Sequence, residues 1–213
     1  KLGDRVESTA NRCHTVLSTV FGWGYERNIV TVNPVLGIKK HKEKPRSRYI
    51  EDWEYDLVYQ IAQKSSYPWI APMMEIAYLC RMRANEVRSL SESNLLIEGI
   101  FVERRKDSMN EITKWSPRLR KAISDASKLR KSMTPDKLLF VSGSTGLIPK
   151  TSFDSAWRRI RTKALEKGLT ESFNFHDLKA KGVTDHTDKA SGHKSKKMQA
   201  VYDRKPSLID ATR

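Results

Sequence analysis

The sequence predicts a mainly helical α+β protein in which a large helical domain carries a small antiparallel β-hairpin and follows part of a second helical domain. Apolar side chains recur at helical spacing through most of the chain, which indicates amphipathic helices. Residues 94–116 change character and hold two short β-prone runs around a polar turn. A basic run over residues 39–48 has no apolar periodicity and predicts an exposed linker. We therefore divide the chain into residues 1–44, the end of a helical domain with its linker, and residues 45–213.

The first predicted helix runs from Val6 to Phe21, where apolar residues repeat at helical spacing over about five turns. Gly22 and Gly24 are expected to end this helix or to loosen its last turn. Asn33-Pro34 then interrupts the chain again before the basic linker.

The second domain is expected to contain seven helices. They are Ile50–Ile61, Met73–Cys80, Glu86–Leu90, Pro117–Lys131, a segment from Thr151 or Ser152 to Lys167, His176–Asp185 and Lys196–Arg204. Thr151 or Ser152 is expected to cap the fifth helix, and Gly168 lies just past its end, as is typical of helix C-termini.

Strands are predicted in two places. Ile100–Val102 and Ile112–Trp115 flank the polar residues 106–110 and predict a β-hairpin. Leu138–Val141 predicts another short strand, and the Ser- and Gly-rich residues 142–146 predict a flexible loop.

Composition narrows the possible functions. Forty Lys and Arg residues against 25 Asp and Glu give the 213-residue chain a formal net charge of +15. With 38% apolar residues the chain can bury a core, so wholesale disorder is excluded. The longest mostly apolar run, Trp69–Cys80, is shorter than the roughly 20 residues that a membrane span needs. The charge favours a polyanionic partner, most commonly nucleic acid, over a basic surface that serves only solubility.

The cysteines and the N-terminus add two expectations. Cys13 and Cys80 lie in apolar patterns, so we expect two buried thiols in a reducing compartment rather than a disulfide. The chain has no signal-peptide pattern, and it begins without Met in the middle of an apolar pattern, so we expect a fragment.

The last forty residues hold a candidate nucleophile. Cleaving a DNA strand without a metal requires a nucleophile, donors for the developing charge, and an acid for the leaving oxygen. Tyr202 lies nine positions after His193 and among basic residues, so its phenol is a candidate for the attack on phosphorus. The alternative is a half-buried helix tyrosine that packs with Met198 and Val201.

Two imidazoles and a lysine precede this tyrosine. His176 and Lys179 are three positions apart and would share one face of a helix, where both could hold one phosphate. The alternative is a capping or core histidine beside a solvated lysine. His193 follows a glycine at an apparent helix start, where its ring N–H could donate to a phosphate oxygen. Alone, it would be an ordinary surface histidine.

Two further candidates lie upstream. Arg83 comes one helical turn before Glu86 and could be a bidentate phosphate clamp that Glu86 supports. The alternative is a plain intrahelical pair worth about 0.2–0.5 kcal/mol. Lys106, in the predicted hairpin turn, could act as general acid for the leaving oxygen. Otherwise it is an exposed turn lysine.

Basic residues outside these positions are predicted to contact DNA phosphates, with plain solubility as the alternative. They are Lys39, Lys40, Lys42, Lys44, Arg46, Arg48, Lys194 and Lys196.

No single motif is specific, but their order and spacing together resemble the active-site pattern of the tyrosine recombinases, the phage integrase family. The matching positions are Arg83-x-x-Glu86, the hairpin Lys106, His176-x-x-Lys179, Gly192-His193 and Tyr202. Residues 1–44, and Asn33-Pro34-Val35 in particular, resemble the end of the family's helical core-binding domain.

The resemblance implies a site-specific DNA recombinase that cleaves and rejoins strands through a 3′-phosphotyrosine intermediate, with residues 45–213 as its catalytic domain. It implies double-stranded DNA as partner, a monomer in solution and a homotetramer on two synapsed sites. It also implies no cofactor, no metal and no membrane, and a bacterial or phage-encoded protein, such as one from a prophage, that acts in the cytoplasm at the nucleoid.

Two departures from the family pattern leave alternatives open. The family usually has a second arginine where this chain has Lys179, and often Thr-Gly-Leu where it has Cys80-Arg81-Met82. A lysine keeps the charge but loses the rigid two-pronged donor, so an integrase-like DNA-binding protein without catalysis is the first rival. A type IB topoisomerase is the second. The third is a metallohydrolase built from His176, Asp177, Asp185, His186 and Asp188, which no metal-binding motif supports.

Overall fold

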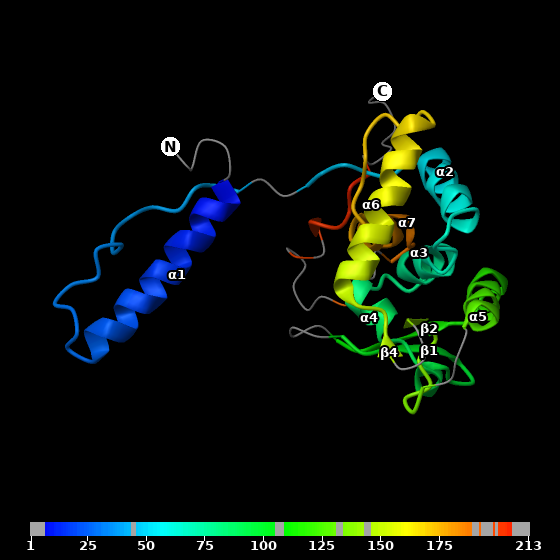
Figure 1. The fold of residues 1–213 in the computed structure, drawn as a ribbon, viewed down its shortest axis with the longest axis horizontal. Helices are drawn as coiled ribbons and strands as arrows, with labels where there is room; N and C mark the ends of the chain where they lie inside the picture. The colour runs from blue at the N-terminus through cyan, green and yellow to red at the C-terminus, as the bar shows by residue number, and fades with distance from the viewer. Residues whose placement is uncertain are drawn as a thin grey trace, which may run out of the picture. The chain divides into compact units, whose positions relative to one another are not determined.

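The computed structural model describes residues 7–43, 46–104, 109–130, 134–142, 146–188, 192, 198 and 200–205. The chain divides into two compact units, Lys1–Arg46 and Ser47–Arg213. Figure 1 shows the first unit in blue, with one long helix, and the second in cyan to red, with the remaining helices and the strands. This architecture confirms the mainly helical α+β prediction.

The first unit contains α1 (Glu7–Glu26), which continues through both glycines that were expected to end or loosen it. The prediction was wrong because an isolated helical glycine costs only about 1 kcal/mol relative to alanine and does not by itself break a helix. The chain then returns along α1 (Figure 1). Asn33 Nδ2 donates to the Ser18 carbonyl at 3.2 Å, and the backbone N–H of His41 donates to Asn11 Oδ1 at 2.8 Å.

The second unit is built around α3, a buried helix whose residues are apolar except for Glu75 and the Tyr78 hydroxyl. Its helices are α2 (Asp52–Gln63), α3 (Ile70–Leu79), α4 (Ala84–Arg88), the 3-10 turn η1 (Glu92–Asn94), α5 (Pro117–Leu129), α6 (Lys150–Glu166) and α7 (Asp177–Asp185). Every residue from Ile70 to Ala77 is buried, as expected of a helix that is covered on all faces. Helices α2, α5 and α7 pack against α3, and α6 packs against α2 (Figure 1).

The predicted hairpin is present. Strands β1 (Gly99–Val102) and β2 (Glu111–Lys114) pair antiparallel, with Ile100 opposite Thr113. Gly99 is required by close packing, because a Cβ there would lie 2.1 Å from the Thr113 carbonyl oxygen. A second small pair joins β3 (Val141–Ser142) to β4 (Gly146–Leu147), so the expected strand begins later than predicted and is paired across the predicted loop.

Helix ends show where local signals were wrong. Helix α6 begins at Lys150 with Pro149 as its N-cap, so Thr151 and Ser152 lie inside the first turn instead of capping it. Gly168 has φ +99° directly past the end of α6, as predicted. Near the C-terminus Met198 and Ala200 are helical, but Tyr202 lies in a turn, so the expected helix does not reach Arg204.

An aromatic cluster supports the segment that leads into α7. Phe153 and Trp157 of α6 meet Phe175 edge-to-face, with ring centroids 4.9 and 5.3 Å apart respectively. Phe175 is buried directly before His176, so this packing sets where α7 begins.

The thiol prediction was half wrong, because Cys80 is buried but Cys13 is exposed on α1. Within the described ranges, no helix combines the length and the apolarity that crossing a bilayer would take.

Candidate active site

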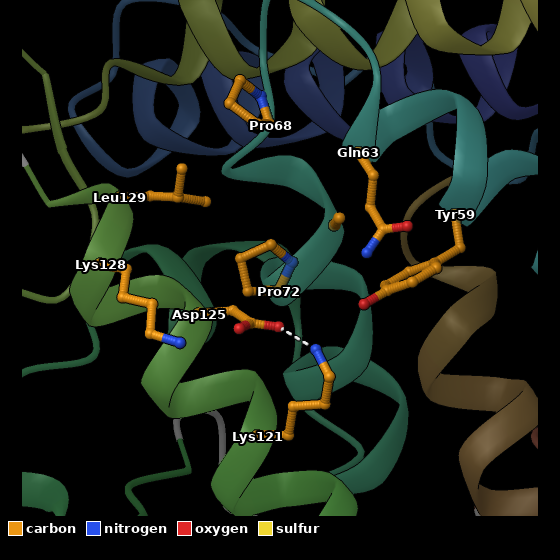
Figure 2. A pocket seen from close by; sticks show the side chains of 9 residues that line it. Tyr59, Gln63, Pro68, Pro72, Lys121, Asp125, Lys128 and Leu129 are labelled. Atoms are coloured by element: carbon orange, nitrogen blue, oxygen red, sulfur yellow. Dashed lines mark hydrogen bonds and ion pairs between the residues drawn. The ribbon is translucent and has the colours of Figure 1, made fainter.

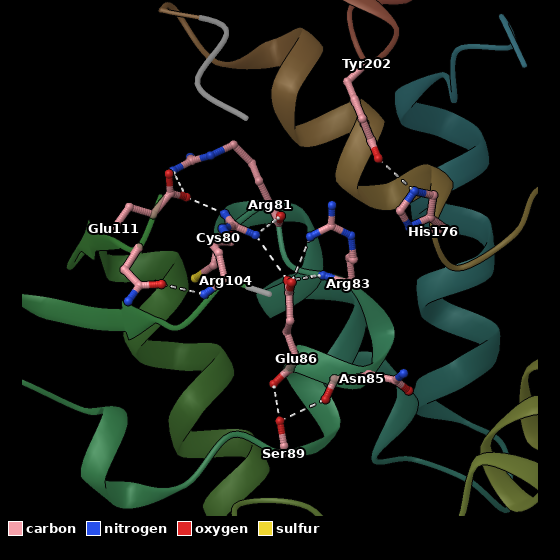
Figure 3. A network of polar contacts seen from close by, with 11 residues as sticks. Cys80, Arg81, Arg83, Asn85, Glu86, Ser89, Arg104, Glu111, His176 and Tyr202 are labelled. Atoms are coloured by element: carbon pink, nitrogen blue, oxygen red, sulfur yellow. Dashed lines mark hydrogen bonds and ion pairs between the residues drawn. The ribbon is translucent and has the colours of Figure 1, made fainter. Parts of the chain in front are cut away.

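Arg83 directly precedes α4 and is fixed by Glu86 one turn later (Figure 3). The Arg83 backbone N–H donates to Glu86 Oε2 at 2.7 Å, and Arg83 Nη1 donates to Glu86 Oε1 at 2.9 Å. Burial would raise the pKa of Glu86, but the hydrogen bonds from Arg83 and the charge of Arg104 hold that pKa below its usual value. The Arg83 side chain remains 25% exposed, so this cation is both held in place and accessible.

Arg104, which follows β1, joins this cluster although the sequence did not single it out. Its side chain is 0% exposed. Nη1 donates to the Arg81 carbonyl at 2.6 Å and to Glu86 Oε2 at 3.2 Å, while Nη2 donates to the Cys80 carbonyl at 3.0 Å and to Glu111 Oε1. Figure 3 shows Arg83 and Arg104 converging on the Glu86 carboxylate. Arg104 therefore ties the hairpin to the turn before α4.

One signal in the sequence could have found Arg104. Side chains of a strand alternate between faces, so Ile100, Val102 and Arg104 share one face of the chain. Ile100 and Val102 are apolar and both are 0% exposed, so the next position on that face points inward as well. The three consecutive cations Arg104-Arg105-Lys106 hid this alternation.

Tyr202 and His176 meet although they are 26 positions apart. The Tyr202 hydroxyl lies 3.2 Å from His176 Nε2, and their rings meet edge-to-face with centroids 5.8 Å apart (Figure 3). Burial, followed by the charge of Arg83, lowers the pKa of His176, which favours the neutral imidazole. A neutral Nε2 facing a phenol can accept its proton.

Lys179, in the first turn of α7, lies beside the same tyrosine. Its side chain is fully buried, and its Nζ is 5.5 Å from the centroid of the Tyr202 ring. Within the described residues this Nζ has no hydrogen-bond partner. Burial first, and then the charges of Arg104 and Arg83, lower the pKa of Lys179 to about 7.

The segment that carries Tyr202 is fastened to α7. Thr184 Oγ1 donates to the Tyr202 carbonyl at 2.9 Å and accepts from the Arg204 backbone N–H at 3.0 Å. Arg204 Nη1 donates to Asp177 Oδ1 at 2.8 Å. These bonds hold the phenol over the start of the helix that carries His176 and Lys179.

Two predicted site residues, Lys106 and His193, lie outside the described residues, but one hydrogen bond joins their neighbours. The Met109 backbone N–H donates to the Gly192 carbonyl at 2.9 Å. Gly192 has φ +70°, and a Cβ there would lie 3.1 Å from Arg104 Nε. The end of the hairpin turn and the residue before His193 are therefore close to Arg104.

The predicted DNA-contacting residues differ from one another. Lys39, Lys40, Lys42 and Arg46 are exposed, whereas Lys44, Lys194 and Lys196 lie outside the described residues.

Arg48 is held inside the second unit. Its guanidinium pairs with Glu54, and its Nε lies 3.0 Å from Glu171 Oε2. Two carboxylates already neutralise this cation, so it is less suited to a DNA phosphate than the exposed lysines of the linker.

The residues of the metallohydrolase alternative are engaged elsewhere. Asp177 pairs with Arg204, and Asp185 accepts hydrogen bonds from Tyr49 at 2.6 Å and Tyr78 at 3.0 Å. Across the part of the chain that the structure describes, no three His, Cys, Asp or Glu side chains form a group that could hold a metal.

A separate pocket of about 330 Å³ lies between α2, α3 and α5 (Figure 2). Tyr59, Gln63 and Pro72 line it, and Lys121 of α5 pairs there with Asp125 at 2.6 Å. It contains none of the candidate site residues, so it is separate from the candidate active site.

The sequence pattern of the phage integrase family matches residues 48–206. This chain belongs to the phage integrase family. The match includes every candidate from Arg83 to Tyr202, and it places the residues that meet around His176 inside the family domain. The comparison with curated proteins finds no match.

Solved structures show the same fold. A lambda integrase fragment, crystallised as a dimer bound to a core site, matches with a TM-score of 0.75 and 18% identity over 97% of this chain and 77% of its own. The Tn1549 transposon integrase, in complex with circular intermediate DNA, matches with a TM-score of 0.69 and 15% identity over 97% and 76%. The XerA recombinase matches with a TM-score of 0.58 and 21% identity over 87% and 68%.

Proposed function

We propose that the protein is a site-specific DNA recombinase that cleaves and rejoins DNA strands through a 3′-phosphotyrosine ester at Tyr202. The observation that carries this proposal is the meeting of the Tyr202 hydroxyl and His176 Nε2 at 3.2 Å, inside the family domain. Hydrophobic packing of a tyrosine would not by itself account for a neutral imidazole at the Tyr202 hydroxyl and a buried lysine beside its ring.

The chemistry divides among the side chains of the cluster. His176 accepts the phenolic proton, the phenoxide oxygen of Tyr202 forms a bond to phosphorus, and the bond from phosphorus to the 5′-oxygen breaks. Arg83 donates to the non-bridging oxygens as charge develops on them. Lys106 supplies the proton that the departing 5′-oxygen takes, and His193 donates a further hydrogen bond to the phosphate.

Religation reverses these steps. The 5′-hydroxyl of an incoming strand gives its proton to Lys106 and attacks phosphorus, the bond from phosphorus to the Tyr202 oxygen breaks, and Tyr202 takes back the proton that His176 held. The ester conserves the energy of the phosphodiester bond, so the proposed reaction needs no nucleotide cofactor and no metal.

DNA binding is supported by the net positive charge of the chain and by its exposed basic linker. A net charge of +15 and the exposed lysines of the linker favour contacts with phosphates. We propose that residues 1–44 end a core-binding domain, that residues 45–213 form the catalytic domain, and that the two bind double-stranded DNA together.

A lambda integrase tetramer has been crystallised on a Holliday junction, with a TM-score of 0.71 and 19% identity over 93% of this chain and 60% of its own. We propose that this chain also acts as a homotetramer on two synapsed sites.

A trapping experiment with duplexes of random sequence tests the proposal and identifies the DNA site at the same time. The protein is incubated with a pool of such duplexes, each with a nick that lets the short cleaved fragment diffuse away. We expect a DNA adduct that survives denaturing electrophoresis, and sequencing of its DNA gives the site.

Two variants complete the test. Tyr202→Phe should abolish the adduct, whereas Tyr59→Phe, in the pocket of Figure 2, should leave it unchanged. Adduct formation by Tyr202→Phe would overturn the assignment of the nucleophile.

A DNA-binding protein without catalysis is the second candidate, and Lys179 is the observation that favours it, because a buried and partly neutral amine is a poor phosphate clamp. Tight binding of duplexes from the random pool with no adduct at any pH would support this candidate. Relaxation of supercoiled plasmids that lack the selected site would instead support the topoisomerase alternative.

A further inference from the structure

Helix α7 carries two buried lysines with opposite surroundings. Lys181 Nζ donates to the Tyr49 hydroxyl and the Ile50 carbonyl at 3.0 Å each and to Asp52 Oδ1 at 2.6 Å. Lys179, two positions earlier, is 0% exposed and has no hydrogen-bond partner within the described residues. A charged ammonium in that position lacks both water and a counter-ion, which is a costly state.

The charges around Lys179 do not supply that counter-ion. Among the described residues the guanidinium groups are those of Arg81, Arg83 and Arg104, and the carboxylates are those of Glu86 and Glu111. Each carboxylate already accepts from two arginines, so the cluster has three cations and two anions before Lys179 is counted.

The groups on the other side of Lys179 are neutral or paired. The lowered pKa of His176 favours its uncharged form, and Tyr202 presents its ring. Asp177 is neutralised by Arg204. A charged Lys179 would therefore give this buried cluster a second net positive charge that no anion among the described residues balances.

We propose that Lys179 is uncharged in the free protein and takes up a proton when a DNA phosphodiester enters the site, so that seating of this phosphate is coupled to protonation of one amine. The inference rests on the proposed function, because that function requires a phosphodiester here. The phosphate supplies the balancing anion, and the ammonium that forms beside it becomes a donor to a non-bridging oxygen.

The lowered pKa of Lys179, about 7, agrees with this assignment. An adjacent phosphate anion favours the charged amine and raises its pKa, by the same electrostatics through which Arg104 and Arg83 lower it. An arginine could not act in this way, because a guanidinium stays protonated at every pH that proteins tolerate. The lysine therefore gives this chain a phosphate site that weakens as the pH rises.

Proton uptake on DNA binding tests the proposal. A duplex of about 30 base pairs and arbitrary sequence serves as the probe, because phosphate contacts do not depend on base sequence. The heat of binding is measured by calorimetry in two buffers of different ionisation enthalpy, and the difference gives the number of protons bound. Wild type is compared with Lys179→Met and Lys179→Arg, and Lys181→Arg is the matched control from the same helix.

At about pH 8, where the amine of the free protein is mostly neutral, we expect the wild type and Lys181→Arg to take up close to one more proton than either Lys179 variant. At about pH 6, where the amine is already charged, the difference should nearly vanish.

Equal uptake by wild type and Lys179→Met at the higher pH would overturn the inference while leaving the proposed function intact. Failure of the wild type to bind the duplex at all would overturn both. Lys179→Met replaces the amine by an apolar chain of similar length, so the comparison stands even if Lys179→Arg does not fold.

Discussion

Lys179 and Lys181 are both buried on one helix, yet the structure gives them opposite roles. Lys181 is surrounded by acceptors from α2 and its N-terminal approach, and its side chain is 2% exposed. These partners raise its pKa, although burial opposes them. Lys179 is buried too, but among the residues that the structure describes its Nζ has no hydrogen-bond partner. A buried cation with all its acceptors is a structural anchor, whereas one without them is a site that awaits an anion.

The largest effect is expected from breaking the anchor. Lys181→Met would remove the donor to the Ile50 carbonyl and to Asp185, whereas the exposed Asp52 remains solvated, so the free energy of unfolding should fall by about 2–3 kcal/mol. Denaturant titration measures this loss. A loss below about 1 kcal/mol would show that Lys181 is no more important than a surface ion pair.

Arg83→Ala should slow the cleavage reaction by a comparable free-energy cost, without a similar loss of stability. Removing one preoriented donor to a developing oxyanion typically slows a reaction by about 100- to 1000-fold. Affinity for the selected duplex should change little, because many other cations contribute to binding. Single-turnover adduct formation and a binding titration separate the two effects. A large loss of affinity with unchanged cleavage would place Arg83 outside the active site.

Lys179→Met should change how the free energy of unfolding depends on pH, because it removes the buried amine. Between pH 7 and the ordinary lysine value of 10.5, the unfolded chain holds a proton on this amine that the folded protein lacks, so wild-type stability rises with pH. The methionine variant has no such proton. The free energy of unfolding of the wild type, measured relative to that of Lys179→Met, should therefore rise by about 2–3 kcal/mol from pH 6 to pH 9. A difference that does not change with pH would contradict the lowered pKa of Lys179.

Among the exposed cations the expected effects are smallest. Replacing any one of Lys39, Lys40 or Lys42 by alanine should reduce the salt slope of DNA binding by about one, without altering cleavage at saturating DNA. Arg48→Ala should leave that slope unchanged, because Glu54 and Glu171 already neutralise this arginine. Binding titrations over a range of salt concentrations test both statements, and an equal change for Arg48 would show that it contacts phosphate.

Much of the fold could be predicted because the signals are local. The hairpin follows from two β-prone runs around a polar turn, and helical spacing predicts α7 to within one residue of its start at Asp177. The prediction that Gly22 and Gly24 end or loosen the first helix was wrong because a helical glycine costs little free energy, which the other residues of α1 outweigh.

The site was only partly predictable, because burial and pairing are tertiary properties. Order and spacing indicated Arg83, His176 and Tyr202, and the structure brings the last two into contact. The three-residue spacing from His176 indicated Lys179, but nothing local predicts that Lys181 has hydrogen-bond partners and that Lys179 has none among the described residues. Lys181 has partners because residues 49–52 pack against its side of α7, whereas Lys179 faces the ring of Tyr202.

Peptide mapping of the trapped adduct tests the central claim most directly. Trypsin should release the heptapeptide Met198–Arg204, in which Tyr202 is the only tyrosine. The account predicts that this peptide carries the mass of the DNA fragment, joined through a phosphate ester to the phenol. DNA attached to any other peptide would contradict it.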